Sequence, residues 1–450
     1  MSNKPEKEQV YARYVASGKT VQHLASWGKR LAEVMNPEGK PEVLDDILVL
    51  DTSYANFSGI IAASFFAEFG AEVIKIEPPE GDPCRRMTPW GENVKGVGIP
   101  FLIEGRNKRY MTLDLKNSEK DRKDFARLAE KAAVVIETFG AGEMDSWGLG
   151  YRQLSQKNPG VIYIAITPYG QYTDKARQFA RFPDSDITSQ AGSGLPAQVG
   201  DPADSGEPYN WPLKAGMWAG WYISGLHAAL GGSFALIHRQ NTGEGQMVDV
   251  ATMDAYSCMV GFPPTIGYTW EAARPRIGVL DFILYPYGCW RCKDGLVVIA
   301  APRDHDFRAL LKILGLWKLE DDWRFTPDRI PDVVENAMIL YNAIEEKTVL
   351  YTADELVNKA LRYSAKAARS KWRGGGVPIV MKVNTPPMTL ENRQFAIRKI
   401  FQEVEDGTLG KLLINTGFVK MSESPPRVKW VSCDIGKDND AVRGKYLQER

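Results

Sequence analysis

One long stretch of this chain has no acidic side chain: residues 208–243 contain neither Asp nor Glu over 36 positions. Cysteine is also scarce, since the 450 residues include only five. A small, odd number of cysteines argues against a disulfide framework. No apolar run reaches the roughly 20 residues that a membrane span needs. The polar start M-S-N-K-P-E-K-E lacks the apolar core of a signal peptide. We therefore expect a cytoplasmic protein.

The charges of the whole chain balance, with 56 Lys and Arg against 56 Asp and Glu. A polyanion such as nucleic acid is an unexpected partner for a chain with no cationic excess. Hydrophobic residues make up 44% and charged residues 25%, which is ordinary for a globular protein. A chain of this length has room for two or three domains.

Buried apolar runs separated by helical patterns predict an α/β fold with parallel strands. The runs expected as strands are 46–51, 71–77, 133–137, 161–166, 246–250 and 295–300, and the expected helices include 60–69, 120–131 and 215–239. We predict a helical N-terminal extension over 1–40, a Rossmann-like large domain over 41–250, a small domain over 251–375, and a C-terminal segment over 376–450 that returns to the large domain.

Several common chemistries find no support in the sequence. The loop after the first strand, residues 52–59, has no G-x-G-x-x-G, so a dinucleotide has no glycine-rich turn to bind. Cys289 and Cys292 form a lone C-x-x-C without a second pair, which favours structural cysteines over a metal site. His227 sits in an apolar helical run and is expected in the core. We expect no metal and no covalently bound cofactor.

Motifs spread over the chain resemble those of one enzyme family. Residues 242–250 read T-G-E-G-Q-M-V-D-V, residues 106–116 read R-N-K-R-Y-M-T-L-D-L-K, and residues 137–148 read E-T-F-G-A-G-E-M-D-S-W-G. Together with 51–77 they resemble the class III CoA-transferases of the formyl-CoA transferase and carnitine CoA-transferase (CaiB/BaiF-like) type, from about residue 43 onward. The resemblance implies an α/β fold with a Rossmann-like large domain and a smaller α+β domain, in an interlocked-ring dimer.

The family acts through an aspartate nucleophile, and the resemblance places a different residue there. The aspartate attacks an acyl-CoA and passes through anhydrides and an aspartyl-CoA thioester. It lies four residues before a Gly that opens an apolar helix running to T-G-x-G-Q. Gly225 opens the matching helix, so the nucleophile position is Trp221, or Gly216 if the register slips by five. Neither is a nucleophile, which implies that this chain has no catalytic residue of its own.

The resemblance also implies a residual CoA pocket at Asn56, Phe57, Lys108 and Phe139. Lys108 would meet a phosphate and Phe139 would form an apolar wall. Other positions depart from the family, because Pro78, Thr138 and Ser146 stand where Arg, Asn and Arg are typical. Losing two cations next to a polyanionic ligand predicts weak CoA binding in this chain.

The first hypothesis is a non-catalytic subunit of a hetero-oligomeric class III CoA-transferase. It would support a paralogous catalytic subunit in an interlocked heterodimer or heterotetramer, with the CoA thioester bound as substrate in the partner's site. The transfer would run between an acyl-CoA such as succinyl-CoA and an acid such as (R)-benzylsuccinate or a similar aromatic acid of anaerobic degradation.

Two alternatives come from other classes of protein. One is a self-sufficient homodimeric CoA-transferase that uses another carboxylate, with Asp184, Asp186 and Glu207 as candidates. Asp186 precedes Gln190 in a family-like D-x-x-x-Q segment, which favours a structural role. The other alternative is a CoA-binding scaffold protein without a transferase partner.

Overall fold

The computed structural model describes residues 33, 35–180, 186–206, 210–273, 275–281, 284–325, 334–369, 376–407, 409–431 and 434–448. The helical extension expected over 1–40 lies almost wholly outside these residues, and so do Asp184 and Glu207. The chain divides into two compact units. The larger contains 34–197, 213–274 and 398–450, and the smaller includes 198–212 and 275–397.

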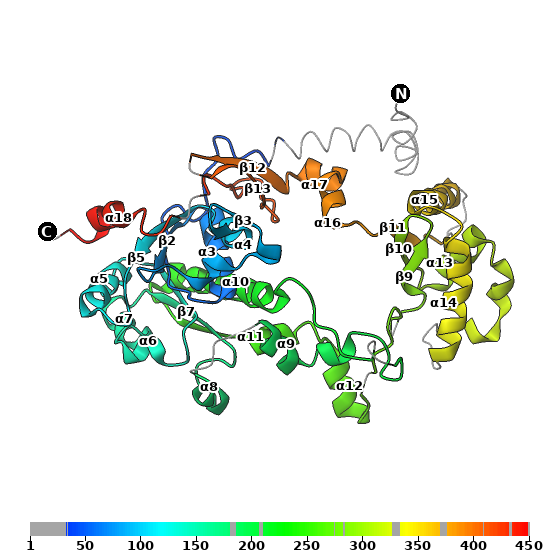
Figure 1. Ribbon diagram of the computed structural model, residues 1–450, viewed down its shortest axis with the longest axis horizontal. Helices are drawn as coiled ribbons and strands as arrows, with labels where there is room; N and C mark the ends of the chain where they lie inside the picture. Colours follow the sequence, from blue (N-terminus) through cyan, green and yellow to red (C-terminus); the bar gives the residue numbers. More distant parts are fainter. Residues whose placement is uncertain are drawn as a thin grey trace. The chain divides into compact units, whose positions relative to one another are not determined.

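A parallel sheet forms the centre of the larger unit (Figure 1). Within the described residues it has six strands in the order β5-β2-β1-β6-β7-β8, and each neighbouring pair is parallel. The strands are β1 (Leu48–Asp51), β2 (Glu72–Glu77), β5 (Lys108–Thr112), β6 (Val134–Glu137), β7 (Ile162–Thr167) and β8 (Met247–Ala251). Five of the predicted runs therefore form strands of a Rossmann-like sheet, whereas β5 was not predicted and the run 295–300 lies in the smaller unit. Strand order reverses between β1 and β6, where open α/β sheets bind ligands beyond their carboxyl ends.

Helices cover both faces of this sheet (Figure 1). On one face Phe66 and Ala228 pack with Ile164, and on the other Phe125 and Val442 pack with the opposite sides of the strands. Burial on both faces explains why β6 and β7 are almost continuous apolar runs. The helices concerned are α3 (Phe57–Glu68) and α10 (Ala219–Thr242) on the first face, and α5 (Glu119–Ala129), α7 (Tyr151–Lys157) and α18 (Asn439–Tyr446) on the second.

The T-G-E-G-Q sequence connects the end of α10 to the start of β8. Gly243 caps the helix in the left-handed conformation, with φ of 81°. At Gly245 an added Cβ would lie 2.0 Å from the carbonyl oxygen of Val161, so only glycine fits there. The chain then enters β8, which pairs with β7. The signature therefore has a structural function in this chain.

The smaller unit contains an antiparallel sheet with one covered face. Its order is β11-β10-β9. Trp290 and Val297 pack against helices on the covered face, while Tyr287 and Met381 are exposed on the other. Cys289 and Cys292 point to opposite faces of β9 because side chains alternate along a strand, so one metal cannot hold both. The elements are β9 (Tyr287–Cys292), β10 (Gly295–Ala300), β11 (Ile379–Lys382), α13 (Asp304–Leu314), α14 (Val334–Thr348) and α15 (Ala353–Arg369).

The compact units have different bounds from the predicted domains, which placed boundaries at 250/251 and 375/376. Residues 251–274 belong to the larger unit, because α11 (Thr252–Ser257) follows β8 directly and Ala255 packs into the core of the sheet. β11 belongs to the smaller unit because it pairs with β10. The return to the larger unit begins at residue 398.

Shorter elements complete the described part of the chain. They are β3 (Asn93–Val94), β4 (Val97–Gly98), α4 (Ile99–Glu104), α6 (Glu143–Ser146), α8 (Asp174–Gln178), α9 (Asp186–Ser193), α12 (Pro263–Trp270), α16 (Pro386–Leu390), α17 (Arg393–Arg398), β12 (Phe401–Asp406) and β13 (Gly410–Asn415). Among the described helices, none combines the length and the apolar character that a bilayer span requires.

Candidate functional site

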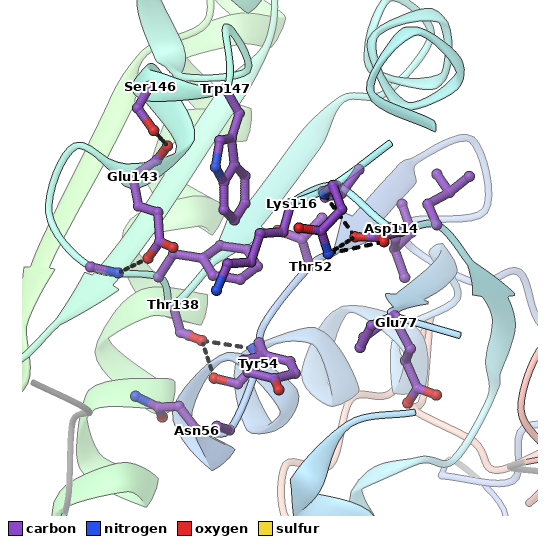
Figure 2. A pocket seen from close by; sticks show the side chains of 18 of the residues that line it. Thr52, Tyr54, Asn56, Glu77, Asp114, Lys116, Thr138, Glu143, Ser146 and Trp147 are labelled. Atoms are coloured by element: carbon purple, nitrogen blue, oxygen red, sulfur yellow. Dashed lines mark hydrogen bonds between the residues drawn. The ribbon is translucent and has the colours of Figure 1, made fainter. Parts of the chain in front are cut away.

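A cavity of about 790 Å³ opens beyond the carboxyl ends of the parallel strands (Figure 2). Its lining comes from the segments that follow β1, β2, β5, β6 and β7, so it spans the point where strand order reverses. This is the position at which open α/β sheets bind ligands. Of the residues that the sequence singled out, the cavity brings together Asn56, Pro78, Thr138, Phe139 and Ser146.

Aromatic rings form one wall of the cavity. Tyr54 stacks on Phe139 with ring centroids 6.1 Å apart, and Trp147 meets Phe139 edge-on at 5.0 Å. The Tyr54 amide donates to the Thr138 hydroxyl at 2.9 Å, which ties the loop after β1 to the loop after β6. Phe139 therefore lies in a wall that can pack against a flat ring.

Asn56 and Phe57 occupy different environments although they are neighbours in sequence. Asn56 caps α3, because its side-chain oxygen accepts from the Ser58 amide at 2.8 Å, and it contributes to the cavity lining. Phe57 is only 1% exposed and stacks with Trp218 at 4.9 Å in the hydrophobic core. The structure therefore places Asn56 at the cavity and Phe57 inside the protein.

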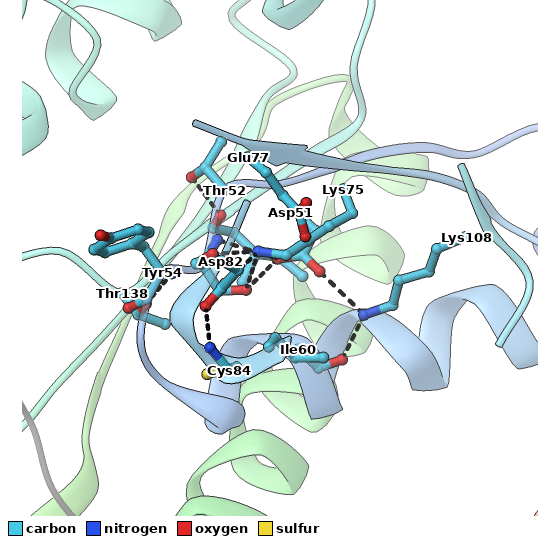
Figure 3. Close-up of polar contacts among 12 residues, drawn as sticks. Asp51, Thr52, Tyr54, Ile60, Lys75, Glu77, Asp82, Cys84, Lys108 and Thr138 are labelled. Carbon is cyan, nitrogen blue, oxygen red and sulfur yellow. Dashed lines mark hydrogen bonds and ion pairs between the residues drawn. The ribbon is translucent and has the colours of Figure 1, made fainter. Parts of the chain in front are cut away.

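Lys108 lies in a buried cluster of charges at the end of β1 (Figure 3). Its Nζ is 3.0 Å from Oδ2 of Asp51 and donates to the Ile60 carbonyl at 2.7 Å. A second ammonium, Lys75, pairs with Asp82 at 3.1 Å. Burial lowers the pKa of Lys108, and the Asp51 carboxylate opposes that shift. The prediction that Lys108 meets a phosphate is corrected, since its ammonium faces interior groups and not the cavity.

Lys116 is the cation that sequence reasoning missed. Among the described residues that line the cavity it is the one cation, and its side chain is exposed. Glu80, Asp114 and Glu143 also line the cavity. The available signal was the L-D-L-K sequence at 113–116, which directly follows a strand on the ligand-binding edge of the sheet.

Glu137 ends β6 beneath the cavity and was not predicted as a site residue. Its carboxyl accepts from the Phe139 amide at 2.7 Å and from Nε2 of Gln171 at 3.3 Å. Burial raises the pKa of Glu137 to about 8, although the Phe139 amide and the Tyr163 hydroxyl oppose the shift. The group is therefore largely protonated at neutral pH, and it holds the loop that carries Phe139.

An indole occupies the position that the resemblance predicts for the nucleophile. Trp221 is 5% exposed and lies in the first turn of α10, with its ring 6.0 Å from Phe57 and 5.7 Å from Trp218. It does not line the cavity. Gly216 precedes Met217 and Trp218, which both have positive φ, 57° and 56°, an uncommon conformation for bulky residues.

Three carboxylates were predicted as alternative nucleophiles, and Asp186 is the one that the structure describes. Its Oδ1 accepts from the Gly220 amide at 2.6 Å and its Oδ2 accepts from Nε2 of Gln190 at 2.6 Å. The side chain is buried at the N-terminus of α10, where a negative charge is favourable. Both oxygens are engaged, as expected for a structural role.

The model of CoA-transferase family III matches residues 44–439. The chain belongs to CoA-transferase family III. A succinyl-CoA–D-citramalate CoA-transferase from Chloroflexus aurantiacus is 31% identical over 412 residues, covering 91% of this chain and 95% of the relative. The alpha subunit of a succinyl-CoA–L-malate CoA-transferase from the same organism is 31% identical, covering 90% and 89%.

Other similar proteins match about half or most of the chain. Subunit BbsE of the succinyl-CoA:(R)-benzylsuccinate CoA-transferase from Thauera aromatica is 35% identical over 199 residues, or 44% of this chain and 46% of BbsE. The crystal structure of a CAIB/BAIF family protein from Brucella suis superposes with a TM-score of 0.74 at 27% identity, covering 90% of this chain and 99% of that protein. These similarities agree with the α/β fold.

Proposed function

We propose that this family III chain is a non-catalytic subunit of a hetero-oligomeric CoA-transferase. A paralogous chain supplies the aspartate nucleophile, and this chain completes the assembly around the partner's site. One observation carries the proposal: a buried indole, Trp221, stands where the resemblance predicts the nucleophile, and it packs against both Phe57 and Trp218. An indole in that environment has no nucleophilic atom to offer an acyl-CoA.

The relatives support a two-chain assembly and a succinyl donor. One relative is named as an alpha subunit, and another is a subunit of the benzylsuccinate enzyme. All three relatives named above are succinyl-CoA enzymes. We therefore propose succinyl-CoA as the donor and a dicarboxylic acid such as benzylsuccinate as the acceptor, in an interlocked-ring heterodimer or heterotetramer within the cytoplasm.

The test compares the chain alone with the chain co-purified with its paralogue. The chain alone should transfer no CoA from succinyl-CoA to any carboxylate, whereas the complex should. Borohydride or hydroxylamine added to the working complex should trap the acyl-aspartyl group on the partner, and mass spectrometry should find this chain unmodified. Turnover by the chain alone, or an aspartyl adduct on this chain, would contradict the proposal.

Asp186 supports a second candidate, a self-sufficient homodimer. Its carboxylate contacts the amide of Gly220, the residue next to Trp221, so a carboxylate does lie beside the nucleophile position. If it were the nucleophile, the chain alone would turn over and Asp186→Asn would abolish turnover. If it is structural, Asp186→Asn lowers the unfolding midpoint, and the single chain is inactive with or without the substitution.

A further inference from the structure

The cavity beyond the sheet has an acidic lining. Its described carboxylates are Glu77, Glu80, Asp114 and Glu143, against the single ammonium of Lys116. Glu77 is paired with a guanidinium, because Arg85 Nη2 lies 2.9 Å from its Oε2. The remaining three carboxylates and one ammonium give a net charge of −2 (one minus three).

Two of these carboxylates are held in place by the backbone. Asp114 accepts from the Asn117 amide at 2.9 Å, and Glu143 accepts from the Gly140 amide at 3.2 Å. Such fixed carboxylates cannot turn away when an anion enters. Glu80 is exposed on the loop after β2 and completes the acidic side of the cavity.

The field at the aromatic wall has the same sign. Burial raises the pKa of the Tyr54 hydroxyl, and the carboxylates of Asp82 and Glu80 raise it further. Arg86 opposes them with a smaller effect. An anionic ligand placed beside Tyr54 would therefore meet a negative potential.

The remaining lining suits an uncharged ring. Tyr54, Phe139 and Trp147 present ring surfaces, and fixed carboxylates accept hydrogen bonds from hydroxyl groups. A planar aromatic group that carries hydroxyl donors and no phosphate fits this combination. A phosphorylated ligand would bring several negative charges into a lining that already carries a net −2.

We infer that this cavity admits a flat, hydroxyl-bearing aromatic group and excludes the phosphorylated nucleotide end of CoA. The inference rests on the proposed function, because it explains why CoA in the assembly is bound by the partner and not by this chain. Glu80, Asp114 and Glu143 are then specificity-determining residues that act by charge.

The probes are adenosine and adenosine 3′,5′-bisphosphate, which share the ring and differ in their phosphates. Binding to the full chain is measured by titration calorimetry at low and high NaCl. Adenosine should bind at least about tenfold more tightly than the bisphosphate. Added salt should strengthen bisphosphate binding, because it screens a repulsion, and should leave adenosine binding unchanged.

A pair of substitutions should reverse the sign of the salt effect. Glu80→Lys with Ser146→Arg changes the net charge of the lining from −2 to +1, since the two changes add two and one. This variant should bind the bisphosphate more tightly than adenosine, and salt should weaken that binding. Glu346→Lys is the control, because it repeats the charge change of Glu80→Lys on the exposed side of α14. It should behave as the unmodified chain does.

Two outcomes would overturn the inference. One is tighter binding of the bisphosphate by the unmodified chain with affinity that falls as salt rises. The other is no detectable binding of adenosine to any variant. Neither probe contains a thioester, so these results are separate from turnover and trapping, which test the missing nucleophile.

Discussion

Trp221 packs against the stacked rings of Phe57 and Trp218, and that packing decides what an aspartate placed at this position would do. Its ring lies near Phe57 and Trp218, in the first turn of a helix whose entry has two residues with positive φ. A carboxylate placed there would be smaller than the indole and would be surrounded by apolar rings. The position therefore accommodates an aromatic side chain better than the family's aspartate.

We predict that Trp221→Asp yields an unstable or inactive chain. Replacing the indole removes packing worth about 3–5 kcal/mol, and burying a charge adds to that loss. Urea unfolding should show the decrease in stability, and CoA-transfer assays should show no gain of activity. Trp221→Phe is the control and should retain most of the stability. Activity of Trp221→Asp near that of the catalytic partner would show that the nucleophile alone had been lost.

Glu137 gives a second prediction at the residue scale, concerning pH. Its pKa is about 8 in the folded chain against an ordinary value of 4.5, because burial favours the neutral acid. The folded chain thus keeps a proton that the unfolded chain releases, and stability falls as pH rises from about 4.5 to about 8.

Replacing Glu137 with glutamine removes the group that titrates in this range. Glu137→Gln should be less stable overall, because its amide has one acceptor oxygen where the carboxyl accepts from both the Phe139 amide and Nε2 of Gln171, but its stability should change less with pH. The difference in slope should approach about 1.4 kcal/mol per pH unit within that window. Urea unfolding between pH 5 and 8 measures it. Glu346→Gln, on an exposed helix face, should keep the slope of the unmodified chain, and equal slopes for all three would contradict the assignment.

At the scale of elements, the buried charges at the end of β1 connect the strands to the cavity. Lys108 on β5 and Lys75 on β2 both reach toward β1, where Asp51 accepts from Lys108 (Figure 3). Asp82 also accepts from the Ala55 amide at 3.1 Å, and Ala55 lines the cavity. The cluster therefore holds the loop after β1 in place through the contact between Asp82 and Ala55.

We predict that Lys108→Met destabilises the fold by about 3–5 kcal/mol, because it leaves the Asp51 carboxylate buried without one of its ammonium partners. Circular dichroism during urea unfolding measures the change. Lys116→Met is the control, since Lys116 is an exposed cation of the cavity lining and should leave stability nearly unchanged. Equal stability of the two variants would show that the Lys108 pair contributes nothing.

At the scale of the whole molecule, we expect the chain to act on a partner through the open sheet face of the smaller unit. Tyr285 is buried and donates to the Ala337 carbonyl, so it supports the fold of its own unit. Tyr287, two residues later, is 43% exposed on the uncovered face. Only the second of these tyrosines is available to another chain.

We predict that Tyr287→Ala changes kcat or KM of the reconstituted complex severalfold, while the unfolding midpoint of the chain stays within the range of ordinary surface substitutions. Steady-state kinetics with succinyl-CoA measures the effect. Leu350→Ala, at an exposed position beyond α14 in the same unit, should leave the kinetics unchanged. Unaltered kinetics for Tyr287→Ala would argue against a role of this face in the partner's reaction.

The sequence by itself determined five of the six described strands of the sheet and the family. Apolar runs such as 161–166 and the T-G-E-G-Q signature are local patterns whose meaning does not depend on distant contacts. The long interval without Asp or Glu is likewise a property of the chain alone, and α10 occupies most of it.

Only the tertiary structure decided which polar residues face the cavity. Lys108 and Lys116 stand in one motif eight positions apart, yet burial against Asp51 takes the first into the interior and leaves the second at the cavity. The acidic lining is assembled from the ends of three different strands and the loops that follow them, and the raised pKa of Glu137 comes from its burial. Side-chain direction and desolvation depend on neighbours far away in sequence, so no local pattern could have specified them.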